Sequence, residues 1–161
     1  MLKVPYVRQK ADYTCGPAAL SMVLQNGGIK APMDFLIKQC RAHKNHGTNR
    51  RTMAKIMREY GFACHGHSGS SVNELRQFIK AGVPLIVNYR EHVVDDRHYA
   101  VVIGISADKI IMHDPYHGPN FTVSIPLFVK SWYGLHRTVN RRWMLAASNW
   151  VLDTPVRCCE T

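Results

Sequence analysis

The chain has 161 residues, of which 46% are hydrophobic and 20% are charged. This length suits one domain, and the composition supports a buried core, which excludes a disordered protein. Lys and Arg outnumber Asp and Glu by 21 to 11, and the resulting charge of +10 suits an acidic partner such as nucleic acid, lipid or peptide. The basic residues are spread along the chain without a recognised nucleic-acid-binding motif, so nucleic acid is not expected as the main partner.

Three features bear on the cellular location. The longest uncharged apolar runs fall short of the roughly 18 residues of a membrane span, so we expect no membrane-spanning segment. The N-terminal residues lack the apolar core of a secretory signal, so we expect no export. The five cysteines are an odd number without a CxxC pair, which favours reduced thiols in the cytoplasm over a disulfide framework or a structural zinc site.

The N-terminal part of the sequence predicts two helices. A nearly apolar run that includes Pro17 should form a buried central helix, which begins after Thr14 and ends at 26–28, Asn-Gly-Gly. Either Thr14 or Asp12 is suited to cap this helix. A second helix is predicted from residue 32 to about residue 42.

Two further helices follow. Thr48 is the predicted cap of the third helix, in which apolar residues recur at helical spacing until Gly61 ends it. The fourth helix should begin at Ser71, with Glu74 three residues later in a capping-box pattern, and end at Gly82.

From residue 83 the pattern changes to strands. The predicted strands are 83–89, 99–105, 109–113, 120–125 and 142–146, with a short helix at 126–132. The link at 106–108 is short enough for a hairpin. Helices followed by mostly antiparallel strands indicate an α+β fold. No linker divides them, so we expect a single domain over 1–154 and a loosely held tail at 155–161.

Two groups of residues raise the question of a metal site. The sequence 64–67, Cys-His-Gly-His, lies in a Gly/Ser-rich stretch predicted to be a loop. His113 and His117 are separated by Pro115, which argues against a ligand-bearing helix. Both groups are therefore interpreted as exposed loop histidines, and no metal or organic cofactor is expected.

Cys15 is the strongest candidate for a nucleophile. It lies at the predicted start of a buried helix, where unpaired backbone N–H groups and the helix dipole favour a thiolate. The thiolate is the form that attacks a carbonyl carbon. An inert structural cysteine is the alternative, and position alone does not decide between the two.

Three more residues complete the roles of an acyl-transfer site. His98 precedes a predicted strand and would take the proton of the thiol. Asp114 follows the next strand, so hairpin pairing would place it beside His98, where it would orient the imidazole. Gln9 would donate to an oxyanion beside the Cys15 backbone N–H. Taken singly, they are also explained as a strand-edge histidine, an Asp-Pro turn and a surface glutamine.

The motifs around these residues resemble a known family. VPYVRQ at 4–9 and YTCGPAAL at 13–20 are similar to the N-terminal motif of the bacteriocin-processing (double-glycine leader) cysteine peptidases and their stand-alone relatives, within the papain-like group. HYAVVIG at 98–104 resembles the histidine motif of that family, and Asp114-Pro115 with Gly118 resembles its aspartate motif. The resemblance extends over roughly residues 4–133.

This resemblance implies a role for each of the four residues. Cys15 would be the nucleophile, His98 the base and acid, Asp114 the orienting residue and Gln9 the oxyanion donor. It also implies a papain-like fold with the cysteine on a central helix against an antiparallel sheet. Thr14 stands where many relatives have an acidic residue, and the membrane and nucleotide-binding parts of the transporter-linked members are not in this sequence. Cleavage after a Gly-Gly pair is therefore not carried over.

Three functions remain open on the sequence. The first is a cysteine peptidase or amide hydrolase that forms an acyl-thioester on Cys15. Its substrate would be a peptide or protein, and the positive net charge of the chain would favour an acidic one. The second is an acyl transferase or transglutaminase-like enzyme that uses the same residues with another acceptor. The third is a non-catalytic module of the same fold that binds an extended peptide.

Overall fold

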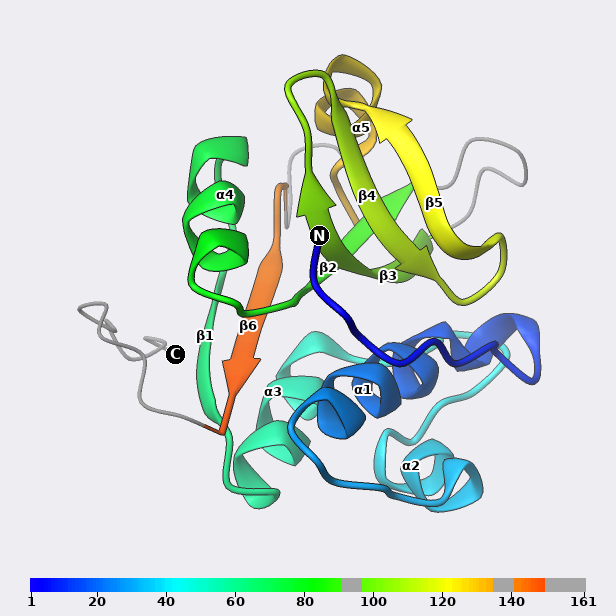
Figure 1. Ribbon diagram of the computed structural model, residues 1–161. Coiled ribbons are helices and arrows are strands. Elements are labelled where there is room, and N and C mark those ends of the chain that lie inside the picture. The colour runs from blue at the N-terminus through cyan, green and yellow to red at the C-terminus, as the bar shows by residue number, and fades with distance from the viewer. Residues whose placement is uncertain (91–96, 135–140, 150–161) are drawn as a thin grey trace.

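The protein is described by a computed structural model for residues 1–90, 97–134 and 141–149. Six antiparallel strands form one sheet in the order β1-β6-β2-β3-β4-β5, with helices on both faces (Figure 1). The strands are β1 (Ala63–His67), β2 (Leu85–Arg90), β3 (Arg97–Ile105), β4 (Lys109–Asp114), β5 (Gly118–Ser124) and β6 (Met144–Ser148). The predicted α+β fold with an antiparallel sheet is confirmed.

The helices follow the apolar runs of the sequence. They are η1 (Asp12–Thr14, a 3₁₀ turn), α1 (Cys15–Asn26), α2 (Met33–Gln39), α3 (Arg50–Glu59), α4 (Val72–Lys80) and α5 (Ile125–Ser131). Ten consecutive residues of α1 are buried, so it is the central helix that the sequence predicts. Among the described residues, no helix has the length and apolar character to cross a bilayer.

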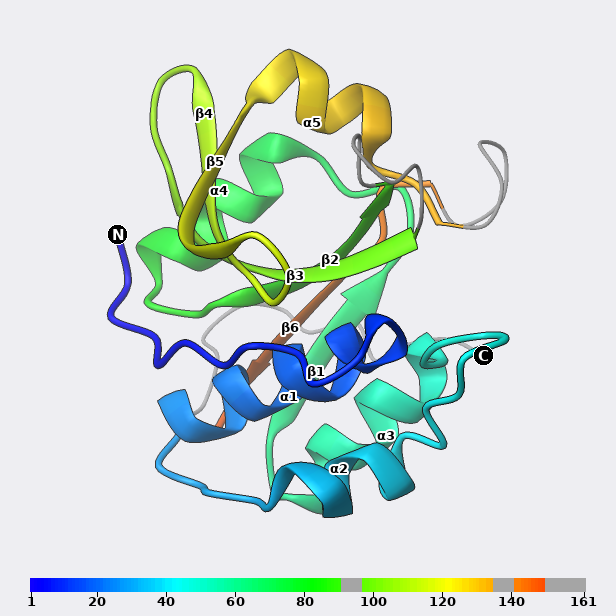
Figure 2. The same ribbon diagram turned by 90° about the vertical axis from the view of Figure 1, so that its right-hand side faces the viewer.

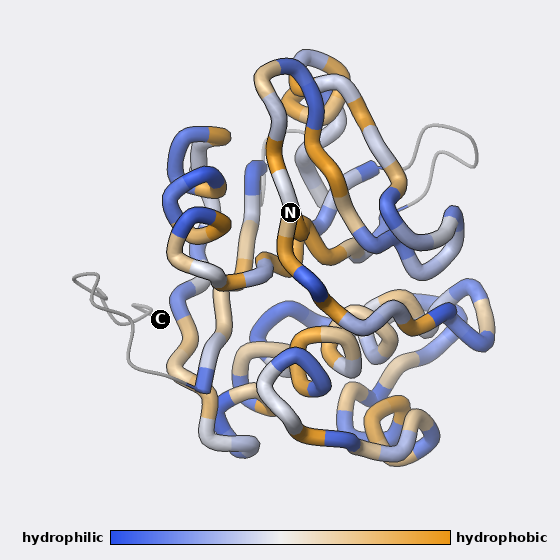
Figure 3. The backbone as a smooth tube through the Cα atoms, viewed as in Figure 1, coloured by the Kyte–Doolittle hydropathy of each residue, from blue (hydrophilic) through white to orange (hydrophobic). Residues whose placement is uncertain are grey.

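Alternation along the strands divides the core into two parts. The part that faces helices α1, α2 and α3 contains Ile86, Val101 and Leu145. The residues next to these along each strand face α4 and α5. Side chains of successive strand residues point to opposite faces, so each strand serves both parts of the core. Figure 3 shows the result: the central strands are largely hydrophobic, whereas α4 alternates between hydrophobic and hydrophilic residues.

The N-terminal segment runs along β3 and β4 before it enters α1 (Figure 2). The Leu2 N–H donates to the carbonyl of Ile103 at 2.7 Å, and His113 Nε2 donates to the carbonyl of Val4 at 2.9 Å. Further on, the Gln9 N–H donates to the carbonyl of Pro115 at 3.1 Å. These bonds fix the approach of the chain to Cys15.

Two predicted helix caps differ from the structure: Thr14 holds the N-cap position of α1 without a cap hydrogen bond, and Thr48 is not the cap of α3. The Thr14 hydroxyl makes no cap to α1, because it turns back to the preceding loop, accepts from the Lys10 and Ala11 N–H groups at 3.0 Å and donates to the Ala11 carbonyl. The cap of α3 is Asn49, whose Oδ1 accepts from the Arg51 N–H at 2.8 Å. By contrast, Ser71 caps α4 as predicted, with its hydroxyl accepting from the Glu74 N–H at 3.1 Å.

The stretch at 64–67 is also not the loop that was predicted. It belongs to β1, an edge strand that pairs with β6 from Ala63↔Ser148 to His67↔Met144. His65 and His67 are half-buried there. His113 is likewise not an exposed loop residue: it lies in β4 and is buried. The predicted tail at 155–161 lies outside the described residues.

Glycine at position 16 is required by close packing at the start of α1. A Cβ added to Gly16 would lie 2.7 Å from both Cβ and Oγ1 of Thr48, which is itself buried. Thr48 is branched at Cβ and has no flexible end that can move aside. The Cys-Gly-Pro sequence therefore lets the loop before α3 approach the helix that carries Cys15.

We expect Gly16→Ala to destabilise the fold by about 1–3 kcal/mol, the usual cost of overpacking, although alanine is the better helix former. The free energy of unfolding from denaturant titration measures this. In a Thr48→Gly background the same substitution should cost much less, because the Cβ that it meets is gone. A stabilising effect of Gly16→Ala in the parent chain would contradict this account.

Candidate active site

Cys15 is the first residue of α1, at the point where the 3₁₀ turn η1 passes into the helix. Pro17 lies in the first turn of α1, where a missing N–H costs no helical hydrogen bond. The Cys15 side chain is buried, with 5% of the residue exposed, and it lines a cleft of about 890 Å³. A thiol at a helix start and on the wall of a cleft is placed to meet a substrate.

His98 and Asp114 come together through the pairing of β3 with β4. Val101 pairs with His113 in this hairpin, which brings the beginning of β3 beside the end of β4. His98 Nε2 lies 2.9 Å from Asp114 Oδ1, and both residues are buried. The structure thus has the hairpin that the sequence predicts, with these two side chains in contact.

Within the described residues, Asp114 accepts hydrogen bonds from four donors. Besides His98, the backbone N–H groups of Tyr116 and His117 donate to Oδ1 at 2.8 and 2.9 Å, and the Tyr89 hydroxyl donates to Oδ2 at 2.6 Å. Burial by itself raises the pKa of Asp114, but the hydrogen bonds from His98, Tyr89 and His117 and the charge of His98 outweigh it and lower the pKa. The carboxylate is therefore charged although the residue is fully buried.

The same contacts act on His98. Burial lowers the pKa of His98, but hydrogen bonds with Asp114 and Cys15, and the negative charges of both, outweigh burial and raise the pKa to about 10. Because Nε2 is bonded to Asp114, Nδ1 is the ring nitrogen left for Cys15. Cys15, His98 and Asp114 thus form a continuous row of side chains, in which the His98 imidazole contacts Cys15 on one side and Asp114 on the other.

Gln9 is placed next to this row by its backbone, which is bonded to the carbonyl that follows Asp114. The Tyr6 hydroxyl donates to the same Pro115 carbonyl at 3.4 Å. Gln9 Oε1 is buried and has no hydrogen-bond partner among the described residues. A buried amide oxygen without a partner is free to accept a hydrogen bond from a donor of a ligand.

The cleft in front of Cys15 is basic. Among the described residues, its lining carries four permanent cations, Arg41, Lys44, Arg50 and Arg97, and the carboxylate of Asp12. Arg50 lies over the ring of Trp143 at 5.5 Å, and burial lowers its pKa without removing its charge at neutral pH. The side chains of Arg41 and Lys44 are exposed.

Sequence reasoning missed two residues of β2 that support the site. Tyr89 pairs with His98 across β2 and β3, packs edge-on against its ring at 5.8 Å and reaches Asp114 with its hydroxyl. Asn88 Nδ2 donates to the His98 carbonyl at 3.2 Å. Both residues belong to a predicted strand, and only the strand register would have placed them at the site.

The histidines at 113 and 117 are not arranged as metal ligands. His113 uses both ring nitrogens within the fold, since Nε2 donates to Val4 and Nδ1 accepts from the Asn120 N–H at 3.2 Å. The His117 ring stacks on Phe121 with centroids 4.4 Å apart. Within the described residues, the side chains able to hold a metal lie elsewhere, on β1 and α4.

Comparison with solved structures finds the same fold in several peptidase domains. A double-glycine motif protease from an AMS/PCAT transporter, solved with its leader peptide, has a TM-score of 0.71 and 23% identity over 90% of this chain and 91% of its own. The peptidase domain of Streptococcus ComA, a bifunctional ABC transporter of a quorum-sensing pathway, has a TM-score of 0.73 and 21% identity over 93% of this chain and 100% of its own. A C39-like peptidase from Bacillus anthracis has a TM-score of 0.75 and 16% identity over 90% of this chain and 94% of its own.

Comparison with curated proteins gives no match. The family comparison does: the model of the Peptidase_C39 like family matches residues 1–140. This range contains η1, the five α-helices, five of the six strands and all four candidate site residues. The resemblance seen in the sequence is thereby confirmed, and the chain belongs to the Peptidase_C39-like family of cysteine peptidases.

Proposed function

We propose that this protein is a cysteine peptidase or amide hydrolase that forms an acyl-thioester on Cys15. The observation that carries the proposal is the row of hydrogen-bonded side chains from Cys15 through His98 to Asp114, with Cys15 on the wall of a cleft. A thiolate, an imidazolium and an orienting carboxylate are the groups that this reaction needs.

The reaction proceeds in two steps. In the first, the Cys15 sulfur forms a bond to the carbonyl carbon of the substrate, and the charge moves to the carbonyl oxygen. The C–N bond then breaks as His98 gives its proton to the leaving amine, which leaves an acyl-thioester. In the second, His98 takes a proton from water, the hydroxide adds to the thioester, and the acid leaves as the sulfur regains the charge of the resting pair.

Asp114 and Gln9 stabilise the charges of this reaction. Asp114 holds the His98 ring with Nδ1 toward Cys15 and stabilises its cation, as the buried contact at 2.9 Å supports. Gln9 donates from its amide to the oxyanion, together with the Cys15 backbone N–H. The backbone bond from the Gln9 N–H to the Pro115 carbonyl supports this role, because it holds the residue beside Asp114 and His98.

The substrate that fits the cleft is an acidic peptide. A solved relative of this fold binds a leader peptide, which supports a peptide as the ligand. Within the described part of the cleft lining, four cations outnumber the carboxylate of Asp12, which favours negative side chains near the scissile bond. Thr14, the buried residue before Cys15, stands where many relatives have an acid, which leaves one fewer negative charge beside Cys15.

The nucleophile is tested with a mixed peptide library, containing acidic, neutral and Gly-Gly sequences, read by mass spectrometry. We expect cleavage by the parent chain and a loss of at least about 10³-fold in Cys15→Ala and His98→Ala. His46→Ala is the matched control, since this exposed imidazole lines the same cleft and, among the described residues, hydrogen-bonds to the Gly47 carbonyl and not to Cys15 or His98. It should keep the parent rate.

Other outcomes of that assay would contradict the proposal. Peptide affinity without turnover in the parent and in Cys15→Ala would indicate a binding module. Mass adducts with an added amine, in place of hydrolysed ends, would indicate an acyl transferase.

The positive charge of the cleft leads to a separate prediction about substrate selectivity. We expect Arg41→Glu and Lys44→Glu each to lower kcat/KM for an acidic peptide by about tenfold relative to a neutral one, with a smaller effect in high salt. Lys109→Glu is the control, because it makes the same change of net charge at the opposite end of β4 from Asp114. An equal effect of all three substitutions would show that net charge alone, and not the cleft, selects the substrate.

A further inference from the structure

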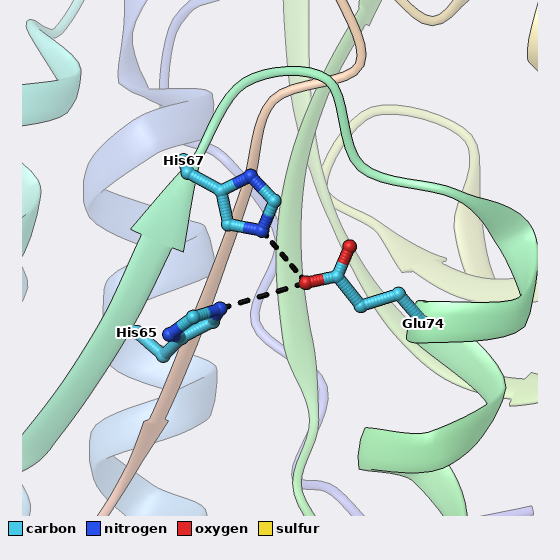
Figure 4. Close-up of side chains that lie close together, drawn as sticks. All are labelled: His65, His67 and Glu74. Atoms are coloured by element: carbon cyan, nitrogen blue, oxygen red, sulfur yellow. Dashed lines mark hydrogen bonds and ion pairs between the residues drawn. The ribbon is translucent and has the colours of Figure 1, made fainter. Parts of the chain in front are cut away.

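Three side chains that lie away from the active site converge between β1 and α4. His65 and His67 are two residues apart on β1, so they share one face of this edge strand. Glu74 is in the first turn of α4, and its carboxylate reaches both imidazoles. Figure 4 shows both imidazoles pointing toward the Glu74 carboxylate.

The distances within this cluster suit a metal ion. His67 Nε2 lies 2.7 Å and His65 Nε2 lies 3.5 Å from the same Glu74 oxygen. The three ligand atoms all lie within 4.8 Å of one another. Zinc held tetrahedrally at about 2.0–2.1 Å from each ligand atom separates these atoms by roughly 3.3 Å. Only small side-chain movements are therefore needed to close the site around an ion.

The surroundings hold the three groups in place. His67 Nδ1 donates to the Ser68 carbonyl at 2.9 Å, the kind of bond by which metal-binding histidines fix the ring and leave Nε2 for the ion. Ser71 fixes the Glu74 backbone through the cap of α4. The His65 ring lies against Phe78 with centroids 5.4 Å apart. The site is thus supported from both elements that form it.

The exposure and the ligand types of the three side chains indicate which ion fits the site. The side chains of His65, His67 and Glu74 are 18%, 40% and 24% exposed, which leaves room for a water as a fourth ligand. Two imidazoles and one carboxylate suit zinc and the other late first-row divalent ions better than calcium or magnesium, which prefer oxygen. Cys64 takes no part, because it lies in the part of the core that faces α3 and its thiol donates to the Phe62 carbonyl.

We propose that His65, His67 and Glu74 form a binding site for Zn²⁺ or a similar divalent cation, completed by water, which links the edge strand β1 to α4. On binding, His67 Nε2 gives the proton of its bond with Glu74 to solvent, and its lone pair goes to the metal. The site is separate from the active site, since α4 and the catalytic helix α1 pack against opposite faces of the sheet.

Titration calorimetry with Zn²⁺ tests the proposal on the Cys15→Ala chain, in which the catalytic thiol cannot compete for the ion. We expect one equivalent to bind, and His65→Ala, His67→Ala and Glu74→Gln each to raise Kd by at least about tenfold. His43→Ala is the control. His43 and His46 also form a pair of close imidazoles, with centroids 5.4 Å apart, but they are outside this cluster. The His43→Ala substitution should leave the Kd for Zn²⁺ unchanged.

A second measurement uses the parent chain and needs no variant to fold. Zn²⁺ should protect His65 and His67, but not His43 and His46, from modification by diethyl pyrocarbonate, mapped by mass spectrometry. Undiminished binding in the three site variants, equal protection of both histidine pairs, or no binding at all would overturn the proposal. Neither measurement depends on peptide turnover, so its outcome is independent of the proposed peptidase activity.

Discussion

The buried carboxylate of Asp114 accepts hydrogen bonds from a side chain on β2, a side chain on β3 and the turn that follows β4. A buried charge without such donors would be strongly unfavourable, so the donors and the carboxylate require one another. The donors lie on β2, on β3 and after β4, so the carboxylate is satisfied only when these three strands pair in the observed register. Tyr89 reaches Asp114 only because β2 pairs with β3 as it does, and His98 only because β3 pairs with β4.

The pH range in which the contact between His98 and Asp114 contributes to stability follows from the shifted pKa values of these two residues. His98 has a pKa raised from 6.5 to about 10, so its contribution is complete below pH 6.5 and is lost as the pH rises through about 10. Asp114 has a pKa lowered from 3.8, so its contribution is present above pH 3.8 and is lost as the pH falls through the lowered value. Around neutral pH the carboxylate and the imidazolium are both charged, which is the state that the proposed chemistry uses.

The rest of the fold delivers Cys15 to this pair. The N-terminal segment is bonded to β3, to β4 and to the carbonyl after Asp114, so it arrives at α1 in a fixed position. Gly16 then allows the buried Thr48 to pack against the first turn of α1. The hairpin is far in the sequence from the N-terminal segment and from Gly16, and all three are needed for the same contact.

Much of this arrangement is predictable from the sequence because local patterns determine it. The apolar run after Pro17 and the capping pattern at Ser71 each specify a helix, and two β-branched runs with a short link specify the hairpin. Once the hairpin is assumed, Asp114 beside His98 follows.

What the sequence does not reveal depends on distant pairing. The segment 63–67 contains a glycine and two histidines and has little strand propensity, and it becomes β1 only because β6 pairs with it from residues 144–148. The pattern at 64–67 raises the question of a metal site, but only the fold shows that Glu74 of α4 meets the two histidines of β1. Tyr89 likewise gains its role through register and not through its sequence neighbours.

The account depends most on the Cys15–His98 ion pair, and the alkylation rate of Cys15 as a function of pH tests it most directly. The measurement compares the parent, His98→Ala and His46→Ala, resolved by peptide mass spectrometry, with glutathione as an ordinary thiol. Cys40 serves as an internal negative control, because burial raises its pKa to about 12. The account predicts rapid alkylation of Cys15 near pH 6 in the parent and in His46→Ala, and loss of this reactivity in His98→Ala. A Cys15 that reacts only as glutathione does, near pH 8.5 and above, or equally in all three chains, would contradict it.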